Sequence, residues 1–189
     1  MTKTFLASVG AAALALTGCA TTMDDDMDDI AYVEGAAMYS SQNIVANASN
    51  SPIHTTLVAA VKQAQLVDTL SGPGPFTVFA PTDQAFSAVP QATRNSLMMD
   101  NNRPALQKVL TYHVVPGRVT ASDLMDRIRA GNGTAMVRTV QGEELTFRMQ
   151  GGNVMIMGKG GSSATVTQAD VMQSNGVIHV VNGVLLPSM

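Results

Sequence analysis

The chain has 189 residues, a formal net charge of −3 at pH 7 and 46% hydrophobic residues, with 4% aromatic residues and no Trp. This length fits one domain, and the near-neutral charge gives no electrostatic support for nucleic-acid binding. Because aromatic side chains are few, the core must be filled by Val, Leu, Ala, Ile and many of the 13 Met residues.

The N-terminus has the pattern of an export signal that ends at a cysteine. Lys3 is followed by an apolar run from Phe5 to Leu16. This run is shorter than the roughly 20 residues of a membrane-spanning helix and fits the apolar region of a signal peptide. It ends in Leu16-Thr17-Gly18-Cys19, which resembles the lipobox of bacterial lipoproteins. We therefore predict a signal peptide over residues 1–18 and lipid attachment at Cys19; the alternative is a plain secretory signal beside a coincidental cysteine.

Lipidation of Cys19 would determine both the chemistry and the location of the mature protein. Cys19 is the only cysteine, so a lipidated chain has no disulfide, no cysteine metal site and no cysteine nucleophile. Each buried acyl CH₂ contributes about 0.8 kcal/mol, so several chains anchor a soluble domain. Ala20 rather than Asp follows the cysteine, which by resemblance to enteric lipoprotein sorting favours the outer membrane. We expect an exported lipoprotein on the periplasmic or surface side, or otherwise a periplasmic or secreted protein.

Residues 19–39 are interpreted as an acidic tether. They contain no Lys or Arg, and their acidic residues are Asp24, Asp25, Asp26, Asp28, Asp29 and Glu34. Such a segment is solvated and self-repelling, and it would hold the domain away from an anionic membrane surface. A Ca²⁺ site in the Asp run is the alternative, but the run lacks the Gly turn and the distal Glu of a calcium loop.

The globular domain is predicted over residues 40–187, with helices first. A first helix is expected from Ser51-Pro52, because Pro is favoured at the first helical position and apolar residues recur at helical spacing as far as Val61. Pro104 begins a second helix. A third covers residues 122–130, capped by Ser122 and ended by Gly131.

Short β-rich segments dominate the second half of the domain. One strand is expected early, at residues 76–80, and the others lie at 135–140, 144–149, 153–157, 164–167 and 177–186, separated by glycines. Helices followed by strands indicate an α+β fold. The closing strands should be mostly antiparallel, since their connections are too short for helical crossovers.

Three stretches in this order along the chain carry a family pattern. They are Phe76–Phe86 (FTVFAPTDQAF), Leu110–Gly117 (LTYHVVPG) and Asn175–Pro187 (NGVIHVVNGVLLP). They resemble the first block, the central Tyr-His segment and the closing block of fasciclin domains, with coverage from about residue 40 to 187. The resemblance implies a compact α+β domain in which helices pack on a mostly antiparallel β-wedge or sandwich.

No catalytic or metal site is expected. His54, His113 and His179 show no metal-ligand spacing; His113 and His179 lie in apolar strand runs as buried core residues, and His54 faces solvent on the first helix. No nucleophile elbow occurs, and Gly158–Ser162 fails the phosphate-loop spacing and is interpreted as a hairpin loop. Met155 and Met157 lie two apart on a strand, where core filling is favoured over a Cu(I) site.

The candidate interaction residues come from the family resemblance. In animal fasciclin proteins, an Asp-Ile pair before the closing block and the Tyr-His segment have been linked to integrin-dependent adhesion. Asp170 and Val171 occupy the first position here, with Val in place of Ile, and Tyr112 and His113 match the second. The alternative is structural, with Asp170 forming a turn and the Tyr-His pair supporting the core.

A scatter of basic residues offers a second candidate surface, for polyanionic glycans, although such residues are more often simply a solvated face. They are Arg118, Arg127, Arg129, Arg138 and Arg148.

The leading hypothesis is a non-enzymatic, lipid-anchored interaction or adhesion domain of the cell envelope or surface. Its partners would be the membrane, through the lipid, and an envelope or matrix protein or a glycan. No cofactor, metal or nucleic acid is expected. The alternative is a periplasmic protein that binds a small ligand or a metal near His113 or the methionines.

Overall fold

The computed structural model describes residues 29–188. The predicted signal peptide, Cys19 and the part of the acidic tether up to residue 28 lie outside these residues. None of the helices in the described part is long and apolar enough to cross a membrane.

A mixed seven-stranded sheet forms the frame of the molecule, in the order β4-β3-β9-β8-β7-β6-β5. Only β3 and β9 run parallel to each other; the other neighbours are antiparallel. The sheet is nearly closed, because the Val140 N–H after β5 donates to the Val114 carbonyl of β4 across 2.8 Å. The strands are β3 (Phe76–Pro81), β4 (Val114–Pro116), β5 (Thr134–Arg138), β6 (Glu144–Gln150), β7 (Asn153–Met157), β8 (Ser163–Gln173) and β9 (Gly176–Val181).

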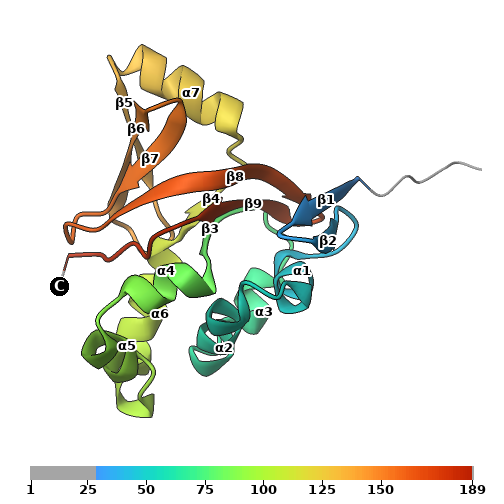
Figure 1. Cartoon of the computed structure of the whole chain (residues 1–189), viewed down its shortest axis with the longest axis vertical. Helices are drawn as coiled ribbons and strands as arrows, with labels where there is room; N and C mark the ends of the chain where they lie inside the picture. The colour runs from blue at the N-terminus through green and yellow to red at the C-terminus, as the bar shows by residue number, and fades with distance from the viewer. Residues whose placement is uncertain (1–28, 189) are drawn as a thin grey trace, which may run out of the picture.

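Helices cover this frame on two sides. In Figure 1, β8 and β9 cross the middle of the molecule, α1 to α6 gather on one side of them, and α7 lies with β5, β6 and β7 on the other. The helices are α1 (Ile44–Asn50), α2 (Thr55–Gln63), α3 (Val67–Leu70), α4 (Asp83–Ala88), α5 (Gln91–Leu97), α6 (Arg103–Tyr112) and α7 (Ala121–Ala130), with a 3₁₀ turn η1 (Asp100–Asn102) before α6. The predicted α+β fold, with helices packed on a mostly antiparallel sheet, is confirmed.

The paired strands β3 and β9 separate two apolar cores. On β3, Val78 and Ala80 face the helix-side core formed with α1, α2 and α6, whereas Phe79 faces the α7-side core with Phe147 and Leu124. Residues in β3 and β9 are therefore buried on both faces of the sheet. This double burial explains why both strands are nearly continuous apolar runs instead of alternating ones.

Residues 30–39, which the sequence places in the tether, instead form a β-hairpin. β1 (Ile30–Val33) pairs with β2 (Ala36–Tyr39) through a turn in which Glu34 and Gly35 have φ values of 47° and 84°. Two successive positive φ values match the twist of hairpin strands. Val33 and Met38 are 0% and 1% exposed in the helix-side core. The predicted domain boundary at residue 40 is therefore too late, because the hairpin at residues 30–39 already belongs to the folded domain.

Several predicted element ends also differ from the structure. Helix α2 begins at Thr55 rather than at Pro52, with His54 at its N-cap. Helix α7 is capped by Thr120, not by Ser122, in a reciprocal capping box with Asp123. Strand β9 ends at Val181 and β8 extends to Gln173. By contrast, the helix from Pro104 and the strand at residues 76–80 lie where they were predicted.

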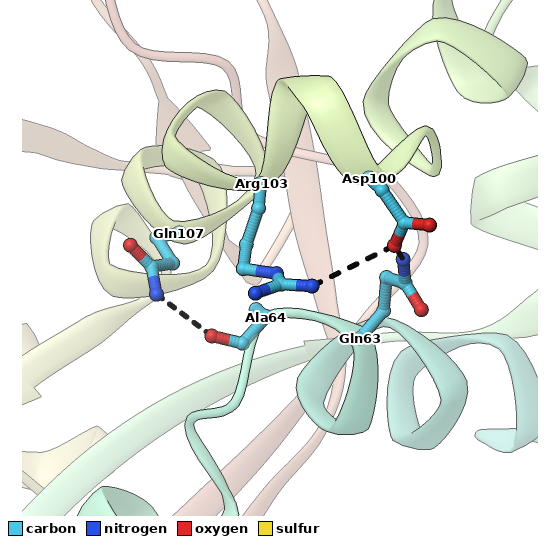
Figure 2. A network of polar contacts seen from close by, with 5 residues as sticks. All are labelled: Gln63, Ala64, Asp100, Arg103 and Gln107. Atoms are coloured by element: carbon cyan, nitrogen blue, oxygen red, sulfur yellow. Dashed lines mark hydrogen bonds and ion pairs between the residues drawn. The ribbon is translucent and has the colours of Figure 1, made fainter.

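Polar contacts between α2 and the start of α6 fix the direction of α6 (Figure 2). The Gln107 side-chain amide donates to the Ala64 carbonyl across 2.8 Å. Asp100 accepts from the Gln63 amide and pairs with the Arg103 guanidinium at 3.6 Å. The ion pair is largely exposed, so it contributes little stability by itself. These contacts join the end of α2 to the first half of α6, and the last residue of α6, Tyr112, contacts the sheet.

Candidate interaction surface

Tyr112 is fully buried at the end of α6 and connects this helix to the sheet. Its hydroxyl donates to the Glu144 carbonyl at 3.1 Å and accepts from the Lys159 N–H at 2.9 Å. Burial raises the pKa of the Tyr112 phenol, so the hydroxyl stays protonated. The hydroxyl thus fixes β6 and the Gly158–Ser162 turn to α6, and the side chain presents no surface to a partner.

His113 is 2% exposed, which confirms its predicted burial. It follows the last residue of α6, however, and is not part of a strand as predicted. Its Nδ1–H donates to the Val109 carbonyl at 2.7 Å, and its Nε2 accepts from the Leu185 N–H at 2.9 Å. One donor and one acceptor nitrogen define a neutral imidazole. Burial lowers the pKa of His113 to about 4. The ring therefore joins the helix to the C-terminal segment.

His179 has the same role on strand β9. Its Nδ1 accepts from the Asp170 N–H at 3.2 Å, and its Nε2–H donates to the Val119 carbonyl at 2.8 Å. Burial is the main cause that lowers the pKa of His179, so this imidazole is also neutral near pH 7. The ring bridges a bulged part of β8 and the segment that leads into α7.

Asp170 is an exposed residue of β8 that contacts the start of α7. Its backbone has φ 58°, which Asn and Asp tolerate better than other non-glycine residues. Its carboxylate accepts from the Ala121 N–H at 2.8 Å, in the first turn of α7, where helix N–H groups have no partner within the helix. The next residue, Val171, is 1% exposed and lies in the helix-side core.

Buried contacts connect the predicted Tyr112-His113 pair with the predicted Asp170-Val171 pair, but the two pairs do not form one surface. The His113 carbonyl accepts from the Phe79 N–H at 2.9 Å, and the Phe79 ring stacks on His179 with centroids 5.4 Å apart. His179 in turn holds Asp170. Of the four predicted residues, Tyr112, His113 and Val171 are buried, and Asp170 alone is exposed. The connecting role of His179 was not foreseen, because its partner is set by the bulge in β8.

His54 is buried, so its predicted exposure to solvent is wrong. It is 1% exposed, and its Nδ1 lies 2.8 Å from the Ser51 hydroxyl. Nearby, Asp83 accepts from the N–H groups of Thr55 and Thr56 at 3.3 and 2.7 Å, which caps α2 from another helix. Burial would raise the pKa of Asp83, but hydrogen bonds lower it overall, first the one that the Thr55 hydroxyl donates at 2.7 Å and then those from the backbone. The Asp83 carboxylate is thus engaged with the helix end, and the group differs from a catalytic triad, in which the carboxylate bonds the imidazole.

The spaces beside His113 are small. Two apolar cavities of about 20 and 30 Å³ lie against it, one toward Phe86 and Leu106 and the other toward Leu57 and Ile44. Each has the size of one or two water molecules, whereas ligand pockets have roughly 300–1,000 Å³. In residues 29–188, no three His, Cys, Asp or Glu side chains form a group that could hold a metal ion.

The predicted basic residues come from several elements. Arg129 pairs with Asp126 at 3.2 Å on α7, Arg118 donates to the Gln173 carbonyl, and Arg138 donates to the Gly142 carbonyl. These three guanidinium groups are therefore each engaged locally.

Comparisons with known proteins identify the family. The family model for the fasciclin domain matches residues 52–187. Protein sll1483 of Synechocystis is 44% identical over 182 residues, covering 93% of this chain and 94% of that protein. The chain belongs to the fasciclin domain family, as its three sequence blocks predicted.

Two further matches are a relative with a surface-protein name and a solved structure with the same fold. The cell surface glycolipoprotein MPB83 of Mycobacterium bovis is 31% identical over 172 residues, covering 81% of this chain and 70% of that protein. The solved structure of a FAS1 domain pair from the insect cell adhesion molecule Fasciclin I matches with a TM-score of 0.67 at 21% identity. That match covers 77% of this chain, which spans about half (51%) of the solved chain, and it supports the fold.

Proposed function

We propose that this chain is a non-enzymatic interaction domain of the cell envelope, exported and held at a membrane by acyl chains on Cys19. Family membership supports this role, as does similarity to a relative whose name is cell surface glycolipoprotein. The lipobox-like end of the signal segment supports the anchor. The partner would be an envelope or matrix protein or a glycan.

The observation that carries the proposal is that the Asp170 carboxylate is exposed to solvent and yet held in a fixed position. Its carboxylate is exposed, yet its position is fixed by two contacts, one from the backbone N–H to His179 and one from Ala121 to the carboxylate. A polar group held in place by its surroundings loses little conformational entropy when a partner binds. The exposed oxygen can accept from an Arg or Lys of a protein, or from a sugar hydroxyl.

The test is capture of partners from envelope fractions by the mature protein, with crosslinking. Asp170→Asn removes the charge but keeps an oxygen for the Ala121 N–H, and Asn tolerates the positive φ. Asp68→Asn is the matched control, since Asp68 is exposed on α3 and its carboxylate makes no hydrogen bond within residues 29–188. We expect a partner that wild type and Asp68→Asn recover and Asp170→Asn recovers several-fold less. Equal recovery by all three proteins would exclude Asp170 from the contact.

The anchor has a separate test. Cys19→Ser should release the protein from membranes or leave an uncleaved precursor. A wild-type protein that is found soluble and cleaved at another position would contradict lipid anchoring. Unchanged cell attachment and aggregation after deletion of the gene would contradict the adhesion role.

A further inference from the structure

We propose that the outer face of the β1–β2 hairpin lies against the lipid–water interface of the membrane that holds Cys19, and thereby orients the domain. This inference rests on the anchoring proposed above. The hairpin is the first described element after the tether, and in Figure 1 it lies at one end of β8, away from the C-terminus.

The register of the hairpin divides its side chains between two faces. Ile30 pairs with Tyr39 and Tyr32 with Ala37 on the outer face, whereas Val33 and Met38 point into the helix-side core. Ile30 and Tyr32 are 41% and 65% exposed. Two of the three Tyr residues of the chain thus lie on this small face, while the third, Tyr112, is fully buried. Tyr beside an aliphatic residue suits the boundary between lipid headgroups and acyl chains, since the ring is apolar and the hydroxyl stays hydrated.

The hairpin is fixed to the rest of the domain. The Gln168 side-chain amide donates to the Tyr32 carbonyl at 2.8 Å, and Asn47 exchanges hydrogen bonds with the Tyr39 backbone at 2.7 and 3.0 Å. With Val33 and Met38 buried, the hairpin cannot turn independently of β8. A contact made by its outer face therefore sets the direction of the whole domain.

The length of the tether brings this face to the membrane. Fully extended, the residues between Cys19 and Ile30 reach at most roughly 40 Å. Tethering over such a distance gives an effective concentration in the millimolar range. A face of one Ile and two Tyr is too small to hold a protein on a bilayer from solution. Once the lipid on Cys19 supplies the attachment, however, this face can stay in contact with the bilayer.

The charges near the hairpin select the type of lipid. Asp29 and Glu34 flank the outer face, and no Lys or Arg occurs in residues 20–35. Anionic lipids attract basic segments and repel acidic ones over about one Debye length. The contact should therefore form on zwitterionic lipids and weaken as the anionic fraction rises.

Depth-dependent fluorescence quenching tests the inference on the mature lipidated protein, reconstituted in phosphatidylcholine vesicles with brominated acyl chains. Ala37→Cys places a thiol on the outer face, and Met136→Cys places a control thiol on β5, where Met136 is 66% exposed. In Figure 1, β5 and the β1–β2 hairpin lie at different ends of the molecule. Both thiols are labelled with the same thiol-reactive fluorophore. Wild type should take up no label, because the Cys19 thiol carries lipid.

We expect the label at Ala37→Cys to be quenched at least twofold more than the label at Met136→Cys. Adding Ile30→Ser and Tyr32→Ser should remove this difference, as should phosphatidylglycerol at half of the lipid. Equal quenching at both positions in protein that floats with the vesicles overturns the inference and leaves the anchor intact. Protein that does not float, or wild type that takes up label, means instead that the anchoring itself fails. Self-quenching at Ala37→Cys that rises with the protein-to-lipid ratio assigns the face to a second copy and also overturns the inference.

Discussion

Acidification should destabilise the domain through His113. Its pKa is about 4 in the folded protein, against 6.5 for an unperturbed histidine, because the ring is buried between α6 and the C-terminal segment. The unfolded chain therefore binds a proton more tightly than the folded one. The stability contributed by the neutral ring is fully present above pH 6.5, falls as the pH drops toward 4, and changes no further below that value. At 1.36 kcal/mol per pKa unit, the loss is about 3 kcal/mol.

Urea unfolding between pH 7 and pH 4 measures this effect. His113→Gln removes the titrating group, so its free energy of unfolding should fall by about 3 kcal/mol less than that of wild type over this range. His54 and His179 also have lowered pKa values, and they contribute equally to both proteins. Parallel curves for wild type and His113→Gln would refute the reasoning. NMR titration of the His113 ring gives an independent value, and a pKa near 6.5 would refute it as well.

Three further predictions concern stability, measured by urea unfolding at pH 7. Met38→Ala should lower the free energy of unfolding by about 2–5 kcal/mol, since the Met38 side chain is 1% exposed. Tyr32→Ala should lower it by under about 0.5 kcal/mol, because Tyr32 is exposed. Equal small effects would mean that the hairpin is not part of the core. Asp170→Ala should lower the free energy of unfolding by about 1–3 kcal/mol, because it removes the hydrogen bond to the Ala121 N–H and places Ala at a positive φ. Asp170→Gly should lower it less, because Gly adopts that φ readily. A larger loss for Gly than for Ala would contradict the strain argument. Asn175→Ala should cost at least about 3 kcal/mol, because its side chain accepts from Ile44 N–H and donates to two carbonyls, at Leu70 and Gly72, in a buried site; a cost under about 1 kcal/mol would contradict this role.

Local patterns predicted the elements that depend on local causes. The strand at residues 76–80 and the helix from Pro104 were placed correctly, since apolar runs and proline position act within a few residues. The hairpin was missed although Glu34-Gly35 and the alternation around them favour one, because the preceding Asp run indicated a tether. Helix α5 was missed for another reason: it has no buried residue and therefore no apolar face to detect.

The site depends on contacts between distant residues, which spacing along the chain does not reveal. His54 is buried at the start of α2, and the adjacent N–H groups of this helix are capped by Asp83 from another helix. The φ of Asp170 and its contact with Ala121 depend on register shifts between β8 and β9. The parallel pairing of β3 with β9 joins Phe76 to Gly176, and no local pattern specifies such a partner.

This parallel pairing has a consequence for the order in which the domain folds. Strand β9 lies between β3 and β8, yet among the strands within residues 29–188 it is synthesised last. A growing chain therefore holds β3 and β4 without the neighbour that completes the sheet, and long-range pairing of this kind forms slowly. The domain therefore cannot close around its two cores until β9 is available. The timing of compaction is therefore set by this one strand, which supplies Ile178 and Val180 to one core and Val181 to the other.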